Sequence, residues 1–190
     1  EPPIYFPRWP VDDVIDKVAA NVASMVEDGS CISFYSGALF EALGRHLARK
    51  RNLGIHTYFF TDPLMDLIKC GAVNNRRKNY FRDKSLTAYA QGTPELMQWL
   101  HRNPLVEFQG IDVVSDHLRI SLNDKMIAIL PARKVDLTGG IALHIGKGNV
   151  TPGPGQAQEF FAGAEHSRGG RTIFALPSRN SESRILERLS

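Results

Sequence analysis

The sequence predicts an α/β fold with a mostly parallel sheet and helices on both faces, and three observations support this class. Short apolar runs rich in Ile, Val, Phe and Tyr are typical of strands. Amphipathic helical patterns separate these runs, as the crossover connections of a parallel sheet require. With 190 residues, 43% of them hydrophobic and 23% charged, the chain can bury a core of this size. The sequence therefore favours one globular domain over a disordered or fibrous chain.

The N-terminal part of the chain is expected to contain a leader and then a helix. Prolines at positions 2, 3, 7 and 10 predict an extended leader over residues 1–10. From Val11 to Val26, apolar residues recur every three or four positions, which predicts a helix. Asp12 and Asp13 lie at its positive end, and Gly29 follows its negative end. We expect residues 11–190 to form the domain proper.

The rest of the chain continues the alternation of strands and helices. Strands are expected at Cys31–Tyr35, Gly54–Phe60, Ser85–Ala90, Leu105–Gln109, Met126–Leu130 and Arg171–Leu176. Helices are expected at Ala38–Lys50, Pro63–Gly71, Thr93–Arg102 and Gln156–Glu165. Ligands of such sheets bind beyond the carboxyl ends of the strands. The loops at 35–37, 58–63, 90–93 and 151–156 are therefore the places to look for a site.

Composition excludes several classes of protein. No apolar run approaches the ~18 residues that span a bilayer, so we expect no membrane partner. The two cysteines, Cys31 and Cys70, are too few for a disulfide scaffold, and with no signal-peptide pattern they favour a cytoplasmic location. The six histidines show no metal-ligand spacing, and we expect no metal.

Two basic clusters, Arg45–Arg51 and Arg76–Lys84, allow more than one interpretation. The second cluster includes Tyr80 and Phe81, and cations with aromatics can bind nucleic acid. The formal net charge is only +3, which favours a solvated loop whose aromatic side chains pack inward. A basic rim for a small phosphate-bearing ligand is a further alternative. We therefore do not expect nucleic acid to be the partner.

The glycine-rich segment Gly146–Gln156 precedes a predicted helix. Backbone N–H groups of such a segment can bind a phosphate or a developing oxyanion. The spacing fits neither a P-loop nor a dinucleotide fingerprint, and a tight turn explains the glycines equally well. On the strand side, His56 and Asp62 flank Tyr58 and form the best local group of polar residues, although a structural histidine is the commoner outcome.

Five motifs in order resemble the C-terminal half of the acetyl-CoA hydrolase/transferase family, which includes 4-hydroxybutyrate CoA-transferase. They are LGIHTYFFTDP at 53–63, NPLVEF at 103–108, NDKMIAI at 123–129, VDLTG at 135–139 and PGPGQAQEFFAGA at 152–164. The resemblance implies a CoA-transferase-like lobe that is part of a longer protein and pairs with a similar N-terminal lobe. It also implies acyl-CoA and a small carboxylate as substrates, with coenzyme A as the exchanged group; a homo-oligomer is left open.

The resemblance implies a catalytic glutamate, and this sequence lacks it at the matching position. In the family, a glutamate attacks the acyl-CoA thioester and becomes a glutamyl-CoA thioester, and water can intercept the acyl intermediate. The matching residue here is Tyr58. A phenol with a pKa near ~10 is a poor nucleophile at pH 7 and cannot form that intermediate. We therefore expect Tyr58 to occupy the nucleophile position without performing the chemistry.

The family's two glycine loops are partly kept. In the first loop only Gly37 remains, and Tyr35 stands where the family has a glycine. In the second loop, Gly153 and Gly155 remain and Gln156 replaces a glycine, while Glu159 falls at an acidic position of the pattern. The resemblance thus implies that CoA contacts Gly37, Gly153, Gly155 and Gln156.

The predicted function is that of a C-terminal domain that binds acyl-CoA thioesters, with transferase chemistry impaired or absent. The alternative is a non-catalytic CoA-sensing or interaction domain of a multidomain protein. An active enzyme with its glutamate supplied elsewhere is also left open.

Overall fold

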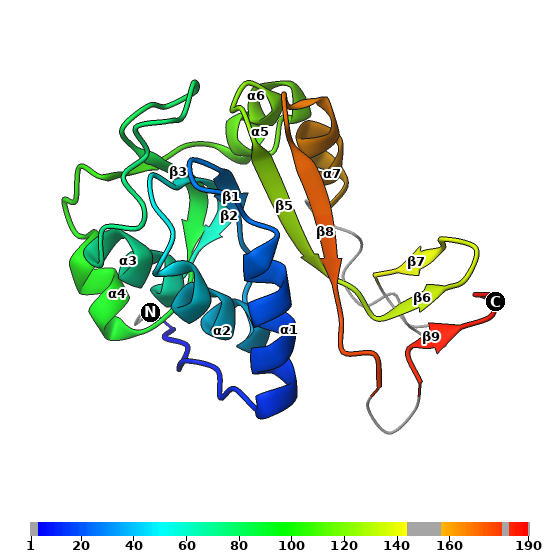
Figure 1. The fold of residues 1–190 in the computed structure, drawn as a ribbon. Coiled ribbons are helices and arrows are strands. Elements are labelled where there is room, and N and C mark those ends of the chain that lie inside the picture. Colours follow the sequence, from blue (N-terminus) through cyan, green and yellow to red (C-terminus); the bar gives the residue numbers. More distant parts are fainter. Residues whose placement is uncertain (1–3, 144–156, 180–182, 190) are drawn as a thin grey trace.

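A six-stranded, wholly parallel sheet forms the centre of the molecule (Figure 1). The computed structural model describes residues 4–143, 157–179 and 183–189. The strand order is β4-β3-β2-β1-β5-β8. The strands span β1 Cys31–Ser33, β2 Gly54–Phe60, β3 Ser85–Ala90, β4 Val106–Phe108, β5 Met126–Pro131 and β8 Arg171–Ala175. This confirms the predicted α/β class and the mostly parallel sheet.

Helices cover both faces of the sheet, as the sequence predicts (Figure 1). One face carries α1 Asp13–Ser24, α2 Ala38–Leu47, α3 Asp62–Lys69 and α4 Pro94–Leu100. The other carries α5 Ile111–Val114, α6 His117–Ser121 and α7 Ala157–His166. The order β2-β1-β5 places the carboxyl end of β1 between two neighbours whose connections run in different directions. In open α/β sheets, ligand sites lie at such a point.

Two apolar cores hold these layers together. The first lies under α1–α4 and contains the fully buried side chains of Phe34, Phe40 and Phe60. The second lies under α5–α7 and is built around Phe160 and Met126. Fully burying an aromatic or aliphatic side chain contributes about 1.5–3 kcal/mol. The positions of the strand ends are therefore fixed by packing on both sides.

Side chains cap two of the helix starts. The Asp12 carboxylate accepts a hydrogen bond from Ile15 N, and the Thr93 hydroxyl accepts one from Leu96 N. Each satisfies an N–H group that the first turn leaves without a partner. The first helix ends at Ser24, with Met25 as its C-cap, and Gly29, with a φ of +80°, serves the turn that leads into β1. The predicted end at Val26 was thus too late by two residues.

A second, three-stranded sheet was not predicted. Its order is β7-β6-β9, from β6 Lys134–Asp136, β7 Ile141–Ala142 and β9 Ile185–Leu186. Figure 1 shows it beyond the carboxyl ends of β5 and β8. Asp136 organises the turn between β6 and β7, since its Oδ1 accepts hydrogen bonds from Thr138 N and Gly140 N. Its Oδ2 accepts one from Leu189 N, which attaches the C-terminal segment.

Candidate functional site

The carboxyl ends of β1, β2 and β3 form the candidate site. β1 leaves the sheet after Ser33, two residues earlier than predicted. The reason is Thr57 on β2, whose hydroxyl accepts a hydrogen bond from Phe34 N at 3.1 Å and donates one to Phe34 O at 2.8 Å. A side chain therefore replaces the backbone ladder at this point. The chain then turns away from β2 and leads through Tyr35 to Gly37.

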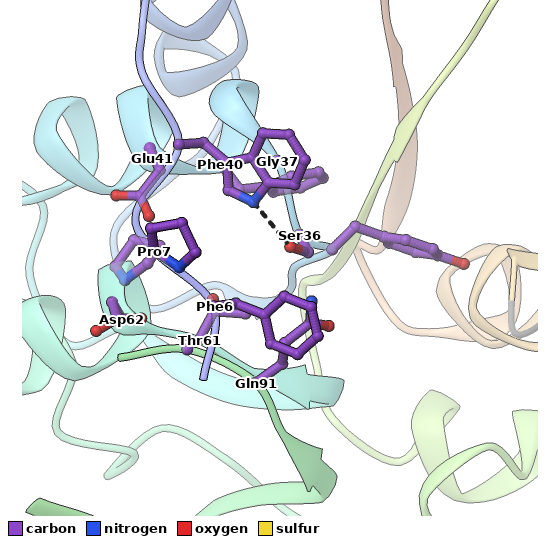
Figure 2. A pocket seen from close by; sticks show the side chains of 13 residues that line it. Phe6, Pro7, Ser36, Gly37, Phe40, Glu41, Thr61, Asp62 and Gln91 are labelled. Atoms are coloured by element: carbon purple, nitrogen blue, oxygen red, sulfur yellow. Dashed lines mark hydrogen bonds between the residues drawn. The ribbon is translucent and has the colours of Figure 1, made fainter. Parts of the chain in front are cut away.

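A small pocket lies where these strand ends meet the start of α2 (Figure 2). Gly37 is the N-cap of α2 and has a φ of +132°, a conformation that L side chains rarely adopt. No other atom lies within 4 Å of the position that a Cβ would take there, so the backbone conformation rather than crowding requires the glycine. The pocket thus includes the first residue predicted to contact CoA.

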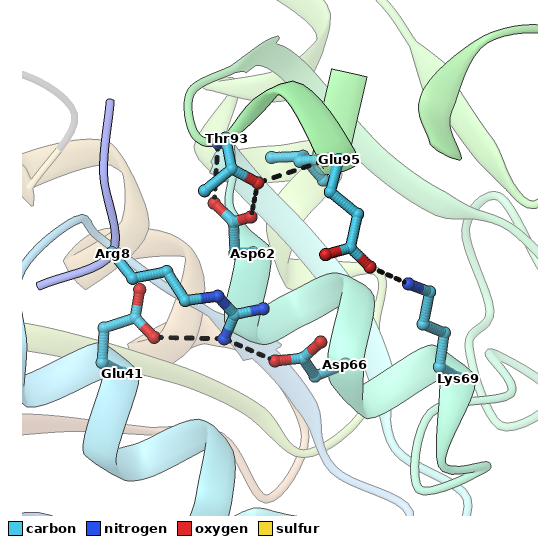
Figure 3. Close-up of polar contacts among 8 residues, drawn as sticks. Arg8, Glu41, Asp62, Asp66, Lys69, Thr93 and Glu95 are labelled. Atoms are coloured by element: carbon cyan, nitrogen blue, oxygen red, sulfur yellow. Dashed lines mark hydrogen bonds and ion pairs between the residues drawn. The ribbon is translucent and has the colours of Figure 1, made fainter. Parts of the chain in front are cut away.

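Residues 6–9 of the N-terminal segment form one wall of this pocket. Phe6 N donates a hydrogen bond to Gly92 O at 2.9 Å, and Trp9 Nε1 lies 3.3 Å from Ser36 Oγ (Figure 2). Arg8 adds ion pairs to Asp66 at 2.7 Å and to Glu41 at 3.5 Å (Figure 3). Burial raises the pKa of the Glu41 carboxyl. Hydrogen bonds and ion pairs therefore hold the N-terminal segment against the carboxyl ends of β1–β3.

Asp62 performs a structural task beside the pocket. It is buried, and its carboxylate accepts hydrogen bonds from the Thr93 hydroxyl at 2.5 Å and from Thr93 N at 3.1 Å (Figure 3). These bonds join the start of α3 to the start of α4. A Cβ on the neighbouring Gly92 would lie 2.1 Å from Asp62 Oδ2. Asp62 is thus used in fixing two helix starts.

Tyr58 lies on β2 among aromatic rings. Its ring centroid is 4.7 Å from that of Phe59 and 5.2 Å from that of Tyr89. The half-buried side chain packs against the second core, on the side of the sheet that carries α7. The residue at the predicted nucleophile position is therefore held by ring contacts at the edge of that core.

Tyr35 and Glu159 converge on the same region from two other elements. Burial, together with the nearby Glu159 and Tyr58, raises the pKa of the Tyr35 hydroxyl to about 12. Tyr35 Oη and Glu159 Oε2 are both fully buried atoms, and neither has a hydrogen-bond partner within the part of the chain that the structure describes. A carboxylate oxygen and a phenol thus lie near Tyr58 without satisfying each other.

His56, in contrast, is part of the core and does not join Tyr58 and Asp62 in one site. Its Nε2 lies 2.9 Å from Val114 O and therefore carries the proton, so Nδ1 accepts from the Asn123 amide at 3.2 Å. Burial and the charge of Lys78 lower the pKa of His56 to about 3. The structural interpretation of this histidine fits these contacts.

The basic segment 76–84 is anchored to the core. Lys78 is buried, and its Nζ donates hydrogen bonds to Ile55 O and Lys84 O, both at 2.7 Å. Tyr80 and Phe81 pack against the second core. The inward packing of these aromatic rings supports the interpretation as a structural loop.

The remaining predicted CoA contacts, Gly153, Gly155 and Gln156, lie outside the described residues. Within the described residues, no group of three or more His, Cys, Asp or Glu side chains could hold a metal ion. No helix in the described part of the chain has the length and apolar character needed to cross a membrane. Sequence reasoning did not connect Tyr35 with Glu159, since only the folded sheet brings them together.

Comparisons with known proteins agree on one family. Residues 92–190 match the model of the acetyl-CoA hydrolase/transferase C-terminal domain. The chain is 34% identical over 174 residues to 4-hydroxybutyrate coenzyme A transferase of Clostridium kluyveri, covering 91% of this chain and 40% of the relative. It is 30% identical to succinyl-CoA:cyclohexane-1-carboxylate CoA transferase of Geobacter metallireducens, covering 95% of this chain and 42% of the relative.

Solved structures give the same result. RipA from Yersinia pestis superimposes with a TM-score of 0.90 at 32% identity, covering all of this chain and 43% of RipA. A 4-hydroxybutyrate CoA-transferase from Porphyromonas gingivalis gives a TM-score of 0.87 at 30% identity, covering all of this chain and 46% of that enzyme. The chain therefore spans less than half the length of these similar proteins.

Proposed function

The chain belongs to the acetyl-CoA hydrolase/transferase family, and from this we propose that it is a C-terminal domain that binds acyl-CoA thioesters but has lost covalent transfer through the usual position. The observation that carries the proposal is Tyr58, which occupies the family's nucleophile position on β2 and packs against Phe59 and Tyr89. A protonated phenol cannot form the acyl-CoA exchange intermediate.

The fold supports ligand binding at this place. Gly37 keeps the backbone geometry of the first loop, and we propose that Gly153, Gly155 and Gln156 supply the second contact. We propose that Lys134 and Arg184 offer positive charge for the phosphates of CoA. Lys134 begins β6 and Arg184 directly precedes β9, and the two segments are neighbours, since Val135 N donates to Arg184 O. The small sheet formed by β6, β7 and β9 lies beyond the carboxyl ends of β5 and β8 (Figure 1).

The wider setting is also a proposal. The substrates would be acyl-CoA and a small carboxylate, and a second, N-terminal lobe of the same family would complete the cleft. Both cysteines are free thiols, which agrees with the proposed cytoplasmic location. The same substitution at Tyr58 favours the alternative of a CoA-sensing domain, which would bind the thioester without turnover.

Calorimetry with acetyl-CoA tests the proposal. We expect saturable heat that weakens at least tenfold in Gly155→Trp, since an indole there would block the approach of a thioester. The control is Leu118→Trp, which adds the same ring at a side chain that is 64% exposed on α6. Absence of heat from the wild-type chain at millimolar acetyl-CoA would contradict the proposal.

A further inference from the structure

Two buried oxygen atoms near Tyr58 require a hydrogen-bond partner that the described residues do not supply. They are Tyr35 Oη, from the segment between β1 and α2, and Glu159 Oε2, from the first turn of α7. Leaving a buried polar atom without a partner costs about 1–3 kcal/mol, and such atoms in a native protein call for a functional explanation. Glu159 lies near enough to Tyr35 for its charge to raise the pKa of the Tyr35 hydroxyl.

The chemistry of the two groups restricts what can lie between them. A carboxylate such as that of Glu159, in the first turn of α7, only accepts hydrogen bonds. Tyr35 is a donor, since burial and the nearby charge keep its phenol protonated far above neutral pH. One molecule that donates to Glu159 and accepts from Tyr35 satisfies both atoms. Water meets this requirement and keeps a second lone pair free.

We propose that Glu159 and Tyr35 hold a water molecule beside Tyr58, and that Glu159 is the general base that directs this water onto a bound acyl-CoA thioester. The inference rests on the proposed function, because it needs a thioester bound at these strand ends. It gives the chain a hydrolytic reaction that does not pass through a covalent enzyme intermediate.

The step balances without any further reactant. The water oxygen attacks the thioester carbonyl carbon while one water proton passes to the Glu159 carboxylate. The carbon–sulfur bond of the tetrahedral intermediate then breaks, and CoA leaves as a thiolate that takes the proton from Glu159. The products are the free carboxylic acid and CoA thiol, and Glu159 returns to its ionised form. Tyr35 donates a hydrogen bond to the attacking water and orients it.

A single-turnover experiment in ¹⁸O-labelled water tests this step. The full chain is held in excess over acetyl-CoA, and release of CoA is followed by chromatography, because the exposed Cys70 would consume thiol reagents. We expect one ¹⁸O atom in the acetate and none in the protein, whose mass stays unchanged. Label in a protein carboxyl group would contradict direct attack by water.

Variants assign the base. Glu159→Gln should slow CoA release by about 10²-fold or more, which is the usual contribution of a general base. The control is Glu165→Gln, which makes the same change at an exposed residue of the same helix and should leave the rate unchanged. Equal rates in Glu159→Gln and the wild type would overturn the proposal.

Tyr35→Phe separates a catalytic effect from a structural one. The hydroxyl has no hydrogen bond to the described residues, so its removal should leave the melting temperature unchanged or raised. We expect CoA release to slow about tenfold in this folded variant, and an unchanged rate would count against the proposal.

Calorimetry distinguishes failure of this inference from failure of the proposed function. If acetyl-CoA binds to the wild-type chain without hydrolysis above the buffer rate, the inference fails and the proposed function stands. If acetyl-CoA does not bind, the proposed function fails as well.

Discussion

His56 shows how one buried side chain sets the acid stability of this fold. In the folded chain its pKa is lowered to about 3 by burial and by Lys78, whereas an unfolded histidine titrates near ~6.5. Between these two values the unfolded chain binds the extra proton. Stability therefore falls as the pH drops from about 6.5 towards 3, by up to about 1.4 kcal/mol per pH unit from this group.

Urea unfolding at pH 7.5, 6 and 5 measures this slope. His56→Gln should give a flatter dependence at a lower overall stability, because the Val114 carbonyl and the Asn123 amide then lose their paired partner. His101→Gln, at an exposed position, should keep the wild-type slope. The same slope in all three proteins would show that His56 does not control the acid response.

At the residue scale, the sequence shows which side chains occupy the candidate site more readily than it shows the role of each. Tyr58 is recognisable at the nucleophile position from neighbouring motif residues, and Thr93 is recognisable as a helix cap from the proline that follows it. The convergence of Tyr35 with Glu159 is not readable, because 124 positions of chain separate them in the sequence. The one available signal was that Glu159 falls at an acidic position of the family's second loop.

At the element scale, Gly44 controls the packing of α2 against α3. A Cβ at this position would lie 2.6 Å from Pro63 Cβ, closer than packed side chains approach. Gly44→Ala should therefore destabilise the chain by about 1–3 kcal/mol in urea unfolding, despite the better helix propensity of alanine. Arg45→Ala, at the adjacent exposed position, should change stability by less than about 0.5 kcal/mol. A stabilised Gly44→Ala would show that the two helices can separate without cost.

The turn at Asp136 holds the C-terminal segment by hydrogen bonds to one carboxylate. These bonds from Leu189 N, Thr138 and Gly140 N lower its pKa to about 2. Asp136→Asn should raise amide hydrogen exchange in residues 184–189, while exchange in β5 stays as in the wild type. Because the folded pKa lies below the unfolded value, this attachment is complete above about pH 4 and weakens as the pH falls towards 2. Unchanged exchange at Leu189 would contradict this role.

Elements of ordinary length follow from local sequence, and the short ones do not. β2 and β3 have their predicted bounds, because their apolar runs end at clear turn residues. α5 and α6 have four and five residues, too few to show a helical period. β9 pairs with β6, about 50 residues earlier in the chain, through only two residues, so no local pattern could have revealed it.

At the scale of the whole molecule, the net charge is small and one cation of the basic segment 76–84 is turned away from solvent. The formal net charge is +3, and the cation at the centre of the 76–84 segment, Lys78, is buried against backbone carbonyls. We expect no retention of a single-stranded oligonucleotide at 150 mM salt in a filter-binding assay, since counterion release needs several free cations on one surface. Retention that falls steeply between 50 and 200 mM salt would instead establish a nucleic-acid site.

The central claim is that the thioester site keeps its backbone geometry while Tyr58 replaces the attacking carboxylate. Intact mass after incubation with acetyl-CoA, before and after borohydride reduction, measures this most directly. We predict no adduct on the wild-type chain, and a CoA adduct in Tyr58→Glu that borohydride converts to a stable, CoA-free product. A borohydride-sensitive CoA adduct on a carboxyl group of the wild-type chain would contradict the account.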